Sequence, residues 1–197
     1  MATVGSRVGS REERRARIEQ TALELFRTRG FDRVTVEDVC AEASVAPATF
    51  YRQFGTKEEV VFAYRDRFRE ALQEALDAAA TVPEPDRLPV VLGGFARFLE
   101  SQQDMLAARD QIVLGHSRLM QRTLALQREL EAALADGLAR LRGVPAADSA
   151  AMLEAGVGLL VLRVAVRSWR AGARGSLGEA TEQVFQELRG LLATGPA

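Results

Sequence analysis

Apolar residues recur along this chain at intervals of three and four, the spacing of an α-helix, and nowhere show the sustained alternation of a β-strand. The first such pattern places four side chains on one helical face: Ile18, Ala22, Leu25 and Phe26. Ser10 and Glu13 form a capping-box pattern that predicts the start of this helix, and Gly30 predicts its end. Residues 1–9 are mostly small and uncharged, so we expect a disordered tail there.

Two short helices around a tight turn are predicted between Thr35 and Phe54. Thr35 is a suitable N-cap for the first helix. Pro47 follows the turn and is favoured at the first position of the second helix. Phe50 and Phe54, four residues apart, predict the inward face of that second helix. The remaining positions are expected on or near its outward side: Ala48, Thr49, Tyr51, Arg52 and Gln53.

The rest of the chain also shows only helical patterns. Thr56 and Glu59 repeat the capping-box pattern and predict a fourth helix that runs to about Ala80. A proline-containing segment, 82–86, then interrupts the pattern. Five further helices are predicted after it: 87–103, 104–115, 117–142, 148–171 and 177–193. The sequence therefore predicts an all-α protein of about nine helices.

Composition adds mainly exclusions. The formal net charge of −1 shows no overall basic excess, so a nucleic-acid-binding face would have to be local. The single cysteine, Cys40, excludes an intramolecular disulfide and fits a reducing compartment. The first twenty residues lack a signal-peptide core, and the longest apolar run, 155–166, is too short to span a bilayer. We expect a soluble, cytoplasmic protein.

Catalytic chemistry finds little support in the sequence. The chain has one histidine and one cysteine, and it contains no nucleophile-elbow, phosphate-loop or metal-ligand motif. We therefore expect no enzyme activity, no catalytic residue, no cofactor and no metal site.

The segment from the first helix through Val60 resembles the TetR family of bacterial one-component repressors. The matching residues keep the order and spacing of the family pattern: Thr35, Ala43-Ser44-Val45-Ala46, Tyr51, Phe54 and Lys57. The resemblance implies an N-terminal three-helix, helix-turn-helix DNA-binding domain over residues 10–57. It also implies a helical-bundle domain for ligand binding and dimerisation over residues 58–197.

The resemblance further implies roles for individual residues. Thr35, Tyr51 and Lys57 would contact phosphates. The residues that would face base edges are Pro47, Ala48, Thr49 and Arg52, with Gln53 reaching backbone or base. The chain departs from the family at Ala46, where a side-chain N-cap is missing, and at Ser44, which replaces a turn glycine.

Five arginines lie near the start of the chain: Arg7, Arg11, Arg14, Arg15 and Arg17. They would form either an arm that reaches the minor groove or phosphates, or a solubilising tail. The tail is the favoured interpretation.

One recognition helix covers few base pairs, so regulators of this kind pair about a two-fold axis on a palindromic operator. The last two helical patterns offer apolar faces for that pairing. The first face contains Met152, Leu153, Gly156, Leu159, Leu160 and Val166. The second contains Leu177, Val184, Phe185, Leu188, Leu191 and Leu192. The resemblance implies that these helices and their copies form a four-helix bundle.

The resemblance also implies an inducer pocket among the middle helices. The apolar candidates, which would equally suit an ordinary core, are Phe95, Phe98, Leu99, Met105, Leu106, Ile112, Val113, Met120 and Leu124. The polar candidates are Arg109, His116, Arg163 and Arg167. A buried arginine needs an anionic partner, either an internal carboxylate (Glu100, Asp110 or Glu154) or a carboxylate or phosphate of a ligand. The spacing favours a cap or surface position for His116 over a metal-ligand role.

Residues 105–171 are similar, more loosely, to regulators with an acyl-CoA-like ligand domain, which implies an acyl thioester as inducer. The expected function is a dimeric, ligand-responsive repressor. It would bind a double-stranded palindromic operator and be released by a small apolar, acyl-CoA-like ligand. The alternative is a DNA-binding-deficient adaptor or acyl-ligand-binding protein of the same fold.

Overall fold

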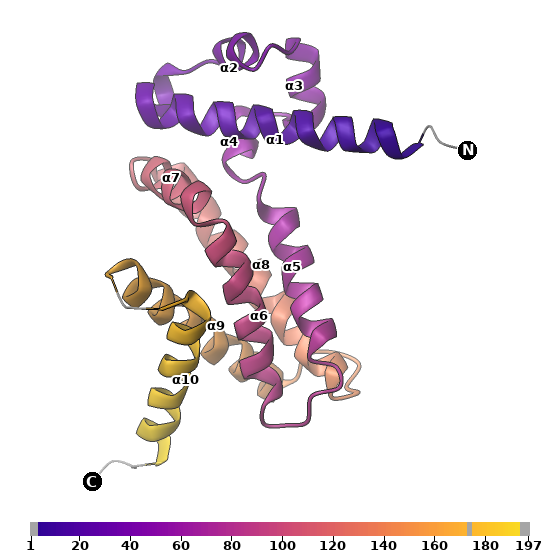
Figure 1. Cartoon of the computed structure of the whole chain (residues 1–197), viewed down its shortest axis with the longest axis vertical. Coiled ribbons are helices and arrows are strands. Elements are labelled where there is room, and N and C mark those ends of the chain that lie inside the picture. Colours follow the sequence, from indigo (N-terminus) through magenta and orange to yellow (C-terminus); the bar gives the residue numbers. More distant parts are fainter. Residues whose placement is uncertain (1–3, 173–174, 194–197) are drawn as a thin grey trace. The chain divides into compact units, whose positions relative to one another are not determined.

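The computed structural model describes residues 4–172 and 175–193. Over these residues the chain forms ten α-helices, one 3-10 helix and no strand (Figure 1). The helices are α1 (Val4–Arg29), η1 (Phe31–Arg33), α2 (Val36–Glu42), α3 (Pro47–Phe54), α4 (Lys57–Val61), α5 (Arg65–Ala78), α6 (Arg87–Ser101), α7 (Gln103–Leu114), α8 (Ser117–Leu141), α9 (Ser149–Arg170) and α10 (Leu177–Ala193). The predicted all-α class is confirmed.

The bounds of α6 to α10 lie within two residues of those predicted from the apolar spacing. The start of α1 does not. This helix begins at Val4, so the tail predicted for residues 1–9 is corrected for residues 4–9, while residues 1–3 lie outside the described residues. Ser10 lies within the helix, so the start predicted at this residue is wrong.

The predicted fourth helix is two helices, and this raises the count from about nine to ten. Helix α4 ends at Val61, and three turn residues precede α5. Phe62 and Tyr64 are the first and last residues of the break, and each is at most 7% exposed. In a continuous helix, residues two apart point to different sides. The break therefore allows both aromatic rings to be buried.

The chain divides into two compact units. Unit 1 contains residues up to Arg65 together with 104–123, and unit 2 contains 66–103 together with 124–197, as far as these are described. The boundary expected after Lys57 thus differs from the structural one. Residues 58–65 stay with the N-terminal helices because Val60 and Val61 are almost fully buried there.

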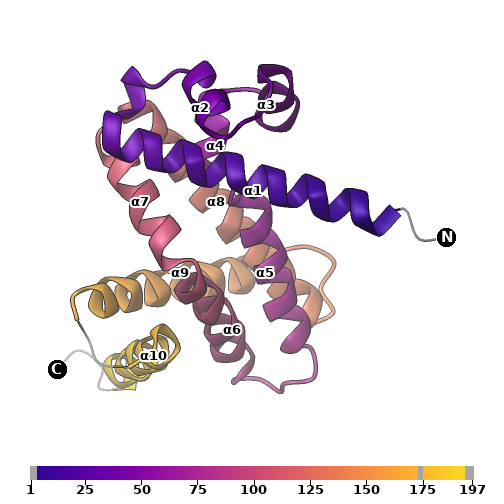
Figure 2. The ribbon, with the colours of Figure 1, turned by 45° about the horizontal axis from the view of Figure 1, so that its top comes forward.

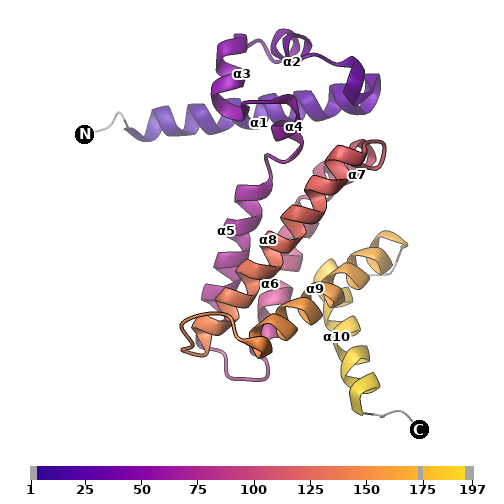
Figure 3. The same ribbon diagram turned by 180° about the vertical axis from the view of Figure 1, so that it is seen from behind.

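In unit 1, α2 and α3 lie on the same side of the long helix α1 (Figures 1 and 3). Helix α1 packs against both α2 and α4, and α2 packs against α3. The side chains at the centre of this packing are fully or almost fully buried: Ile18, Ala22, Phe26, Val34, Val39 and Phe50. These residues fix the two short helices that the sequence predicts as a helix-turn-helix.

In unit 2, α5, α6, α8, α9 and α10 contribute to one apolar core. Two glycines allow helices to approach closely. A Cβ atom at Gly137 of α8 would lie 2.3 Å from Leu76 of α5, and one at Gly94 of α6 would lie 3.1 Å from the Cβ atom of Ala75. Helix α10 packs against both α6 and α9, as Figure 2 shows for α9.

Helix α9 is long and apolar enough, by length and composition, to cross a membrane. Core helices of soluble proteins pass the same test, so the length and composition of α9 are weak evidence for a membrane-spanning helix. Six of its residues are buried in the described part of unit 2: Ala151, Ala155, Gly158, Val161, Leu162 and Ala165. The remainder of its apolar surface is considered with the dimer candidates below.

Candidate DNA-binding and effector sites

Helix α2 begins at a complete capping box. The Thr35 hydroxyl accepts a hydrogen bond from the Asp38 N–H (3.1 Å) and donates one to Asp38 Oδ2 (2.7 Å). Asp38 Oδ2 also accepts the Thr35 N–H (2.8 Å), and these two bonds hold the pKa of Asp38 below its usual value. Thr35 is the N-cap that the sequence predicts. Its hydroxyl proton already points at a carboxylate, so a phosphate contact by this hydroxyl would require it to turn away from Asp38.

The turn before α3 has both irregularities expected from the sequence. Ser44 has a φ of 52°, in the left-handed region that favours glycine. Ala46 occupies the N-cap of α3 and offers no side-chain hydrogen bond, while Pro47 begins the helix. The recognition helix therefore has an N-terminus held by its backbone and by proline, and not by a capping hydroxyl.

Helix α3 has one buried and one open face. Phe50 is fully buried and Phe54 is 6% exposed, and their ring centroids lie 5.4 Å apart. Pro47, Ala48 and Arg52 are exposed, and Thr49 is half-buried. The structure therefore brings the four predicted base-reading residues together on one short helix.

Tyr51 and Arg52 are the large side chains of this open face. Tyr51 is 48% exposed and its ring packs edge-on against Phe50, with centroids 5.8 Å apart. Arg52 Nη2 lies 3.4 Å from the Thr49 hydroxyl, at the limit of a hydrogen bond. Neither side chain is held tightly by these contacts, so both are accessible to a phosphate or base.

Lys57 points into unit 1. Its Nζ donates hydrogen bonds to the carbonyl oxygens of Phe31 (2.7 Å) and Val34 (2.9 Å). The ammonium also lies 4.3 Å from the centroid of the Phe31 ring. The only lysine of the chain thus ties the turn around η1 to the start of α4. This internal role was not predicted from the sequence, and the phosphate contact by Lys57 stays a prediction.

Gln53 also faces partly inward. Its side-chain Oε1 is buried and has no hydrogen-bond partner in the described part of the chain. Its backbone carbonyl accepts a hydrogen bond from Arg15 Nη1 (2.9 Å). In this orientation the side-chain oxygen of Gln53 does not face an incoming duplex.

Two polar effector candidates of unit 1, His116 and Arg109, contact residues near the ends of the DNA-binding segment, Phe31 and Asp32 of η1 and Phe62 and Tyr64 after α4. His116, half-buried, has Nδ1 2.8 Å from the Ile112 carbonyl oxygen and Nε2 3.3 Å from Asp32 Oδ2. A carbonyl only accepts, so Nδ1 donates to the Ile112 carbonyl. The His116 ring also packs edge-on against Phe31. The cap role interpreted for His116 agrees with its bond to the Ile112 carbonyl.

Arg109 is 5% exposed, as expected for a buried arginine. Its Nη1 donates to Asp110 (2.9 Å) and its Nη2 to the Thr123 hydroxyl (2.8 Å). The guanidinium lies over the rings of Tyr64 (4.7 Å) and Phe62 (5.5 Å). Asp110 is thus the internal carboxylate that the sequence offered. Burial raises the pKa of Tyr64, so its hydroxyl stays protonated at neutral pH.

The other apolar effector candidates of unit 1 differ in burial. Ile112 and Val113 are buried core residues. Met105, Leu106 and Met120 are half-buried, while Leu124, which belongs to unit 2, is 51% exposed.

In unit 2, Phe95 and Phe98 form an aromatic cluster with Phe68, with centroid distances of 5.3–6.0 Å. Phe95 is 2% exposed, and Leu99 packs against the same core. These residues fill the core of unit 2, as the alternative interpretation of their spacing allowed.

The expectation of buried arginines is wrong for Arg163 and Arg167, which are both exposed on α9. Two of the carboxylates considered as partners for these arginines, Glu154 and Glu100, accept hydrogen bonds from other groups. Glu154 accepts from Arg142 (2.6 Å), and Glu100 accepts the backbone N–H of Leu177 (3.2 Å). The sequence failed here because α9 is apolar on two sides, so an arginine between apolar residues need not be buried.

The helix α9 carries an exposed apolar stripe at the spacing of one helical face: Leu153, Val157, Leu160 and Val164. Val157 and Val164 were not among the predicted interface residues, although the interval of four from Leu153 and Leu160 would have found them. Two of the predicted ones, Leu159 and Val166, are half-buried against the core of unit 2.

On α10, the predicted interface residues divide in the same way. Val184, Phe185 and Leu188 are half-buried and pack against the core of unit 2. Leu191 and Leu192, near the end of the helix, are 74% and 76% exposed.

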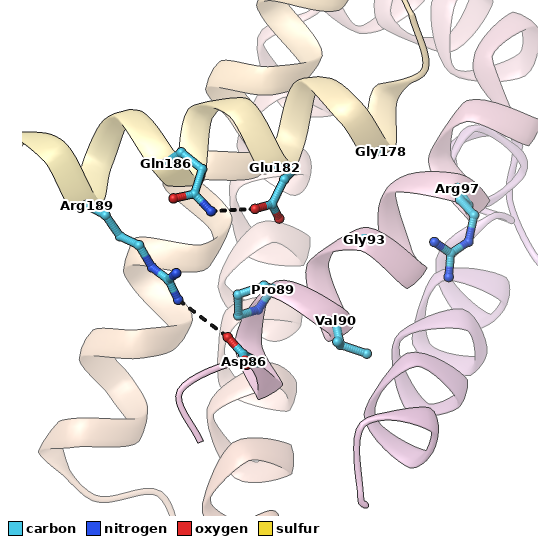
Figure 4. Close-up of a pocket in the computed structure, with 9 residues that line it drawn as sticks. All are labelled: Asp86, Pro89, Val90, Gly93, Arg97, Gly178, Glu182, Gln186 and Arg189. Carbon is cyan, nitrogen blue, oxygen red and sulfur yellow. Dashed lines mark hydrogen bonds and ion pairs between the residues drawn. The ribbon is translucent and has the colours of Figure 1, made fainter. Parts of the chain in front are cut away.

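A groove of about 570 Å³ lies between α6 and α10 of unit 2 (Figure 4). It is lined by Asp86, Pro89, Val90, Gly93, Arg97, Gly178, Glu182, Gln186 and Arg189. At one end, Arg189 lies 3.9 Å from Asp86. None of the predicted effector residues lines this groove. The described residues also contain no group of three or more His, Cys, Asp or Glu that could hold a metal ion.

Comparison with known proteins places these features in a family. Residues 18–64 match the family model of bacterial regulatory proteins of the TetR family. The chain is 30% identical over 155 residues to the HTH-type transcriptional regulator TcmR of Streptomyces glaucescens, covering 73% of this chain and 68% of TcmR.

Solved structures share the fold. One is FadR of Thermus thermophilus, a TetR-family transcriptional repressor in complex with lauroyl-CoA (25% identity, TM-score 0.54, covering 87% of this chain and 91% of FadR). Another is a transcriptional regulator of Aquifex aeolicus (16% identity, TM-score 0.63, covering 90% and 99%). The helix-turn-helix of unit 1, the match over residues 18–64 and the relationship to TcmR together show that this chain belongs to the TetR family of transcriptional regulators, which bind DNA and are not enzymes.

Proposed function

We propose that this regulator is a homodimeric repressor that binds a palindromic operator through α3 and is released by an acyl-CoA-like ligand. The open face of α3 carries the proposal. Pro47 begins this helix of the helix-turn-helix, and Ala48, Thr49 and Arg52 lie away from the buried rings of Phe50 and Phe54. Small side chains there allow close approach to a thymine methyl, and Arg52 offers a fork of donors for guanine.

Dimerisation follows from the size of a half-site and from the exposed stripe of α9. One helix in the major groove reads only a few base pairs, so two copies are needed for a specific operator. The stripe of Leu153, Val157, Leu160 and Val164 is a surface that a second copy would cover. A two-fold dimer through α9 and α10 uses the same surface on both copies.

Phosphate contacts in the proposed complex come first from Tyr51, which is exposed beside the base-reading residues. Thr35 and Lys57 are kept as candidates, although both hold internal hydrogen bonds in the free protein. A transcription regulator acts where the bacterial chromosome is, so the proposed location is the cytoplasm.

The ligand class rests on FadR of Thermus thermophilus, whose structure contains lauroyl-CoA. Met105 and Met120 of unit 1 are half-buried and suit an apolar chain. Arg163 and Arg167 are exposed cations available to phosphates.

Selection of bound duplexes from sheared genomic DNA by the full-length protein tests the DNA part of the proposal. We expect a palindrome whose half-site centres are separated by about one helical turn. Arg52→Ala should relax the base preference at one position of each half-site, and Tyr51→Phe should weaken binding to all sequences alike. Selection of no common sequence would refute the proposed DNA-binding function.

The ligand part is tested on the selected operator. Lauroyl-CoA should weaken binding at saturation, whereas free coenzyme A and laurate, as matched controls, should not. Unchanged operator affinity with saturating lauroyl-CoA and longer acyl-CoAs would refute the acyl-CoA proposal and leave the DNA part standing.

A further inference from the structure

The recognition helix is too short to hold its own conformation. Helix α3 has eight residues and an N-cap without a side-chain hydrogen bond. Helices of two turns are unstable in isolation, so tertiary contacts must fix both its position and its ends. Phe50 and Phe54 fix its buried face. Its carboxyl end needs a separate anchor.

That end carries a carbonyl group that the helix itself does not satisfy. Gly55 ends α3 with a φ of 75°, and its N–H returns to the Tyr51 carbonyl (2.9 Å). The carbonyl of Gln53 instead accepts a hydrogen bond from Arg15 Nη1 (2.9 Å) of α1, 38 residues away in the sequence. The same guanidinium lies 4.8 Å from the centroid of the Phe54 ring.

The chemistry of these contacts suits a permanent internal anchor. A cation at the carboxyl end of a helix is favoured by the helix dipole. The planar guanidinium can donate to a carbonyl and stack on a ring at the same time, which an ammonium cannot do equally well. Arg15 and its neighbour Arg14 are half-buried, whereas Arg11 and Arg17 on the same helix are exposed; the bond to the Gln53 carbonyl belongs to Arg15.

We propose that Arg15 is a positioning residue that sets the orientation of the recognition helix and thereby the sequence specificity of the regulator, without contacting DNA itself. This inference rests on the proposed DNA-binding function of α3. It separates Arg15 from the other N-terminal arginines, which the sequence offered together as an arm or a tail.

The proposal predicts a loss of discrimination. Without the anchor, the last turn of α3 frays, and Arg52 in that turn is no longer held at one place along the duplex. Arg15→Gln should weaken binding to the selected operator by about tenfold, which corresponds to 1.4 kcal/mol. Binding to a nonspecific duplex of the same length should not change.

The salt dependence distinguishes positioning from phosphate contact. Each phosphate contact contributes about 0.9 to the slope of log affinity against log salt concentration for duplex DNA. We expect an unchanged slope for Arg15→Gln. The matched control is Arg17→Gln, which removes the same charge from an exposed position of the same helix and should preserve the ratio of operator to nonspecific affinity.

Hydrogen exchange of the DNA-free protein provides a second readout. The amide of Gly55, which is bonded to Tyr51, should exchange about tenfold faster in Arg15→Gln. Arg15→Lys keeps the charge in a protein that is expected to fold, and it should give an intermediate rate and an intermediate loss of specificity.

Two results would overturn the proposal. One is a reduced salt slope with equal loss on operator and nonspecific DNA, which would make Arg15 a phosphate contact. The other is an unchanged exchange rate at Gly55 together with unchanged specificity. If the wild-type protein selects no operator, the proposed DNA-binding function fails, while the exchange experiment still tests the Arg15 anchor.

Discussion

Replacement of Lys57 by methionine tests whether this lysine stabilises the protein or serves DNA alone. Methionine keeps the length and the apolar stem of the side chain but removes the charge and all three donors. In the structure those donors serve the carbonyl oxygens of Phe31 and Val34, at 2.7 and 2.9 Å. The variant leaves both carbonyls without this partner, and it removes the cation from the face of the Phe31 ring.

The expected loss follows from these contacts. Hydrogen bonds to charged groups contribute about 1.5–3 kcal/mol each when buried, and a cation over a ring adds about 0.5–1 kcal/mol at an exposed site. Lys57 is only half-buried, so water can solvate both carbonyls in the variant. We therefore expect a net loss of roughly 2 kcal/mol in the free energy of unfolding, well below the summed contributions of the two hydrogen bonds and the cation–ring contact. For a chain of this size that lowers Tm by about 4–8 °C.

Thermal unfolding of the DNA-free protein measures this loss, and hydrogen exchange over residues 30–35 shows whether it is local. The control is Arg52→Met, which removes an exposed cation whose one hydrogen bond to the residues that the structure describes is a 3.4 Å contact with Thr49. It should leave Tm unchanged while weakening operator binding. Should Lys57→Met instead keep the wild-type Tm and reduce only the salt slope of DNA binding, by about 0.9, the internal role of Lys57 would be refuted.

Three further predictions concern caps and the dimer. Ala46→Ser supplies the missing N-cap of α3 and should stabilise the protein by about 1 kcal/mol in urea unfolding, with Ala46→Val, which adds no hydrogen-bond acceptor, as the control; equal stabilities of the two variants would contradict it. The pKa of Asp38 is lowered by the Thr35 N–H and hydroxyl, so its stabilising effect is complete above the pKa of the unfolded chain, about 4, and is lost as the pH falls through the lower folded value. Asp38→Asn should therefore flatten the acid limb of the unfolding curve below about pH 4, and an unaltered limb would refute the assignment. Leu160→Glu should weaken dimerisation by about a hundredfold in sedimentation velocity, whereas Leu114→Glu, at a position 75% exposed outside the stripe, should not; equal effects would exclude the stripe as the interface.

The sequence predicts best what depends on neighbours along the chain. The cap at Thr35, the left-handed Ser44 and the uncapped Ala46 all follow from local backbone chemistry, and the structure has each of them. The bounds of α6 to α10 follow from apolar spacing in the same way. Such features need no knowledge of the tertiary fold.

What the sequence misses depends on partners far along the chain. Lys57 points inward because two carbonyls around η1, more than twenty residues earlier, accept its hydrogen bonds. Arg15 was grouped with tail residues because nothing nearby indicates the carbonyl of Gln53. Arg163 was expected to be buried because periodicity cannot tell which face of a helix that is apolar on two sides lies against the core.

The discontinuous composition of unit 1 has a consequence for exchanging parts between regulators. Residues 104–123 belong to the same compact unit as the helix-turn-helix. Within this unit, Arg109 lies over the rings of Phe62 and Tyr64, and Arg122 lies over the ring of Phe62. A graft of the first 65 residues onto a related regulator would leave these rings against foreign side chains. A chimaera that keeps this packing must carry two segments of sequence, the residues up to 65 and residues 104–123. The part that must be transferred together is therefore longer than residues 18–64, over which the family is identified.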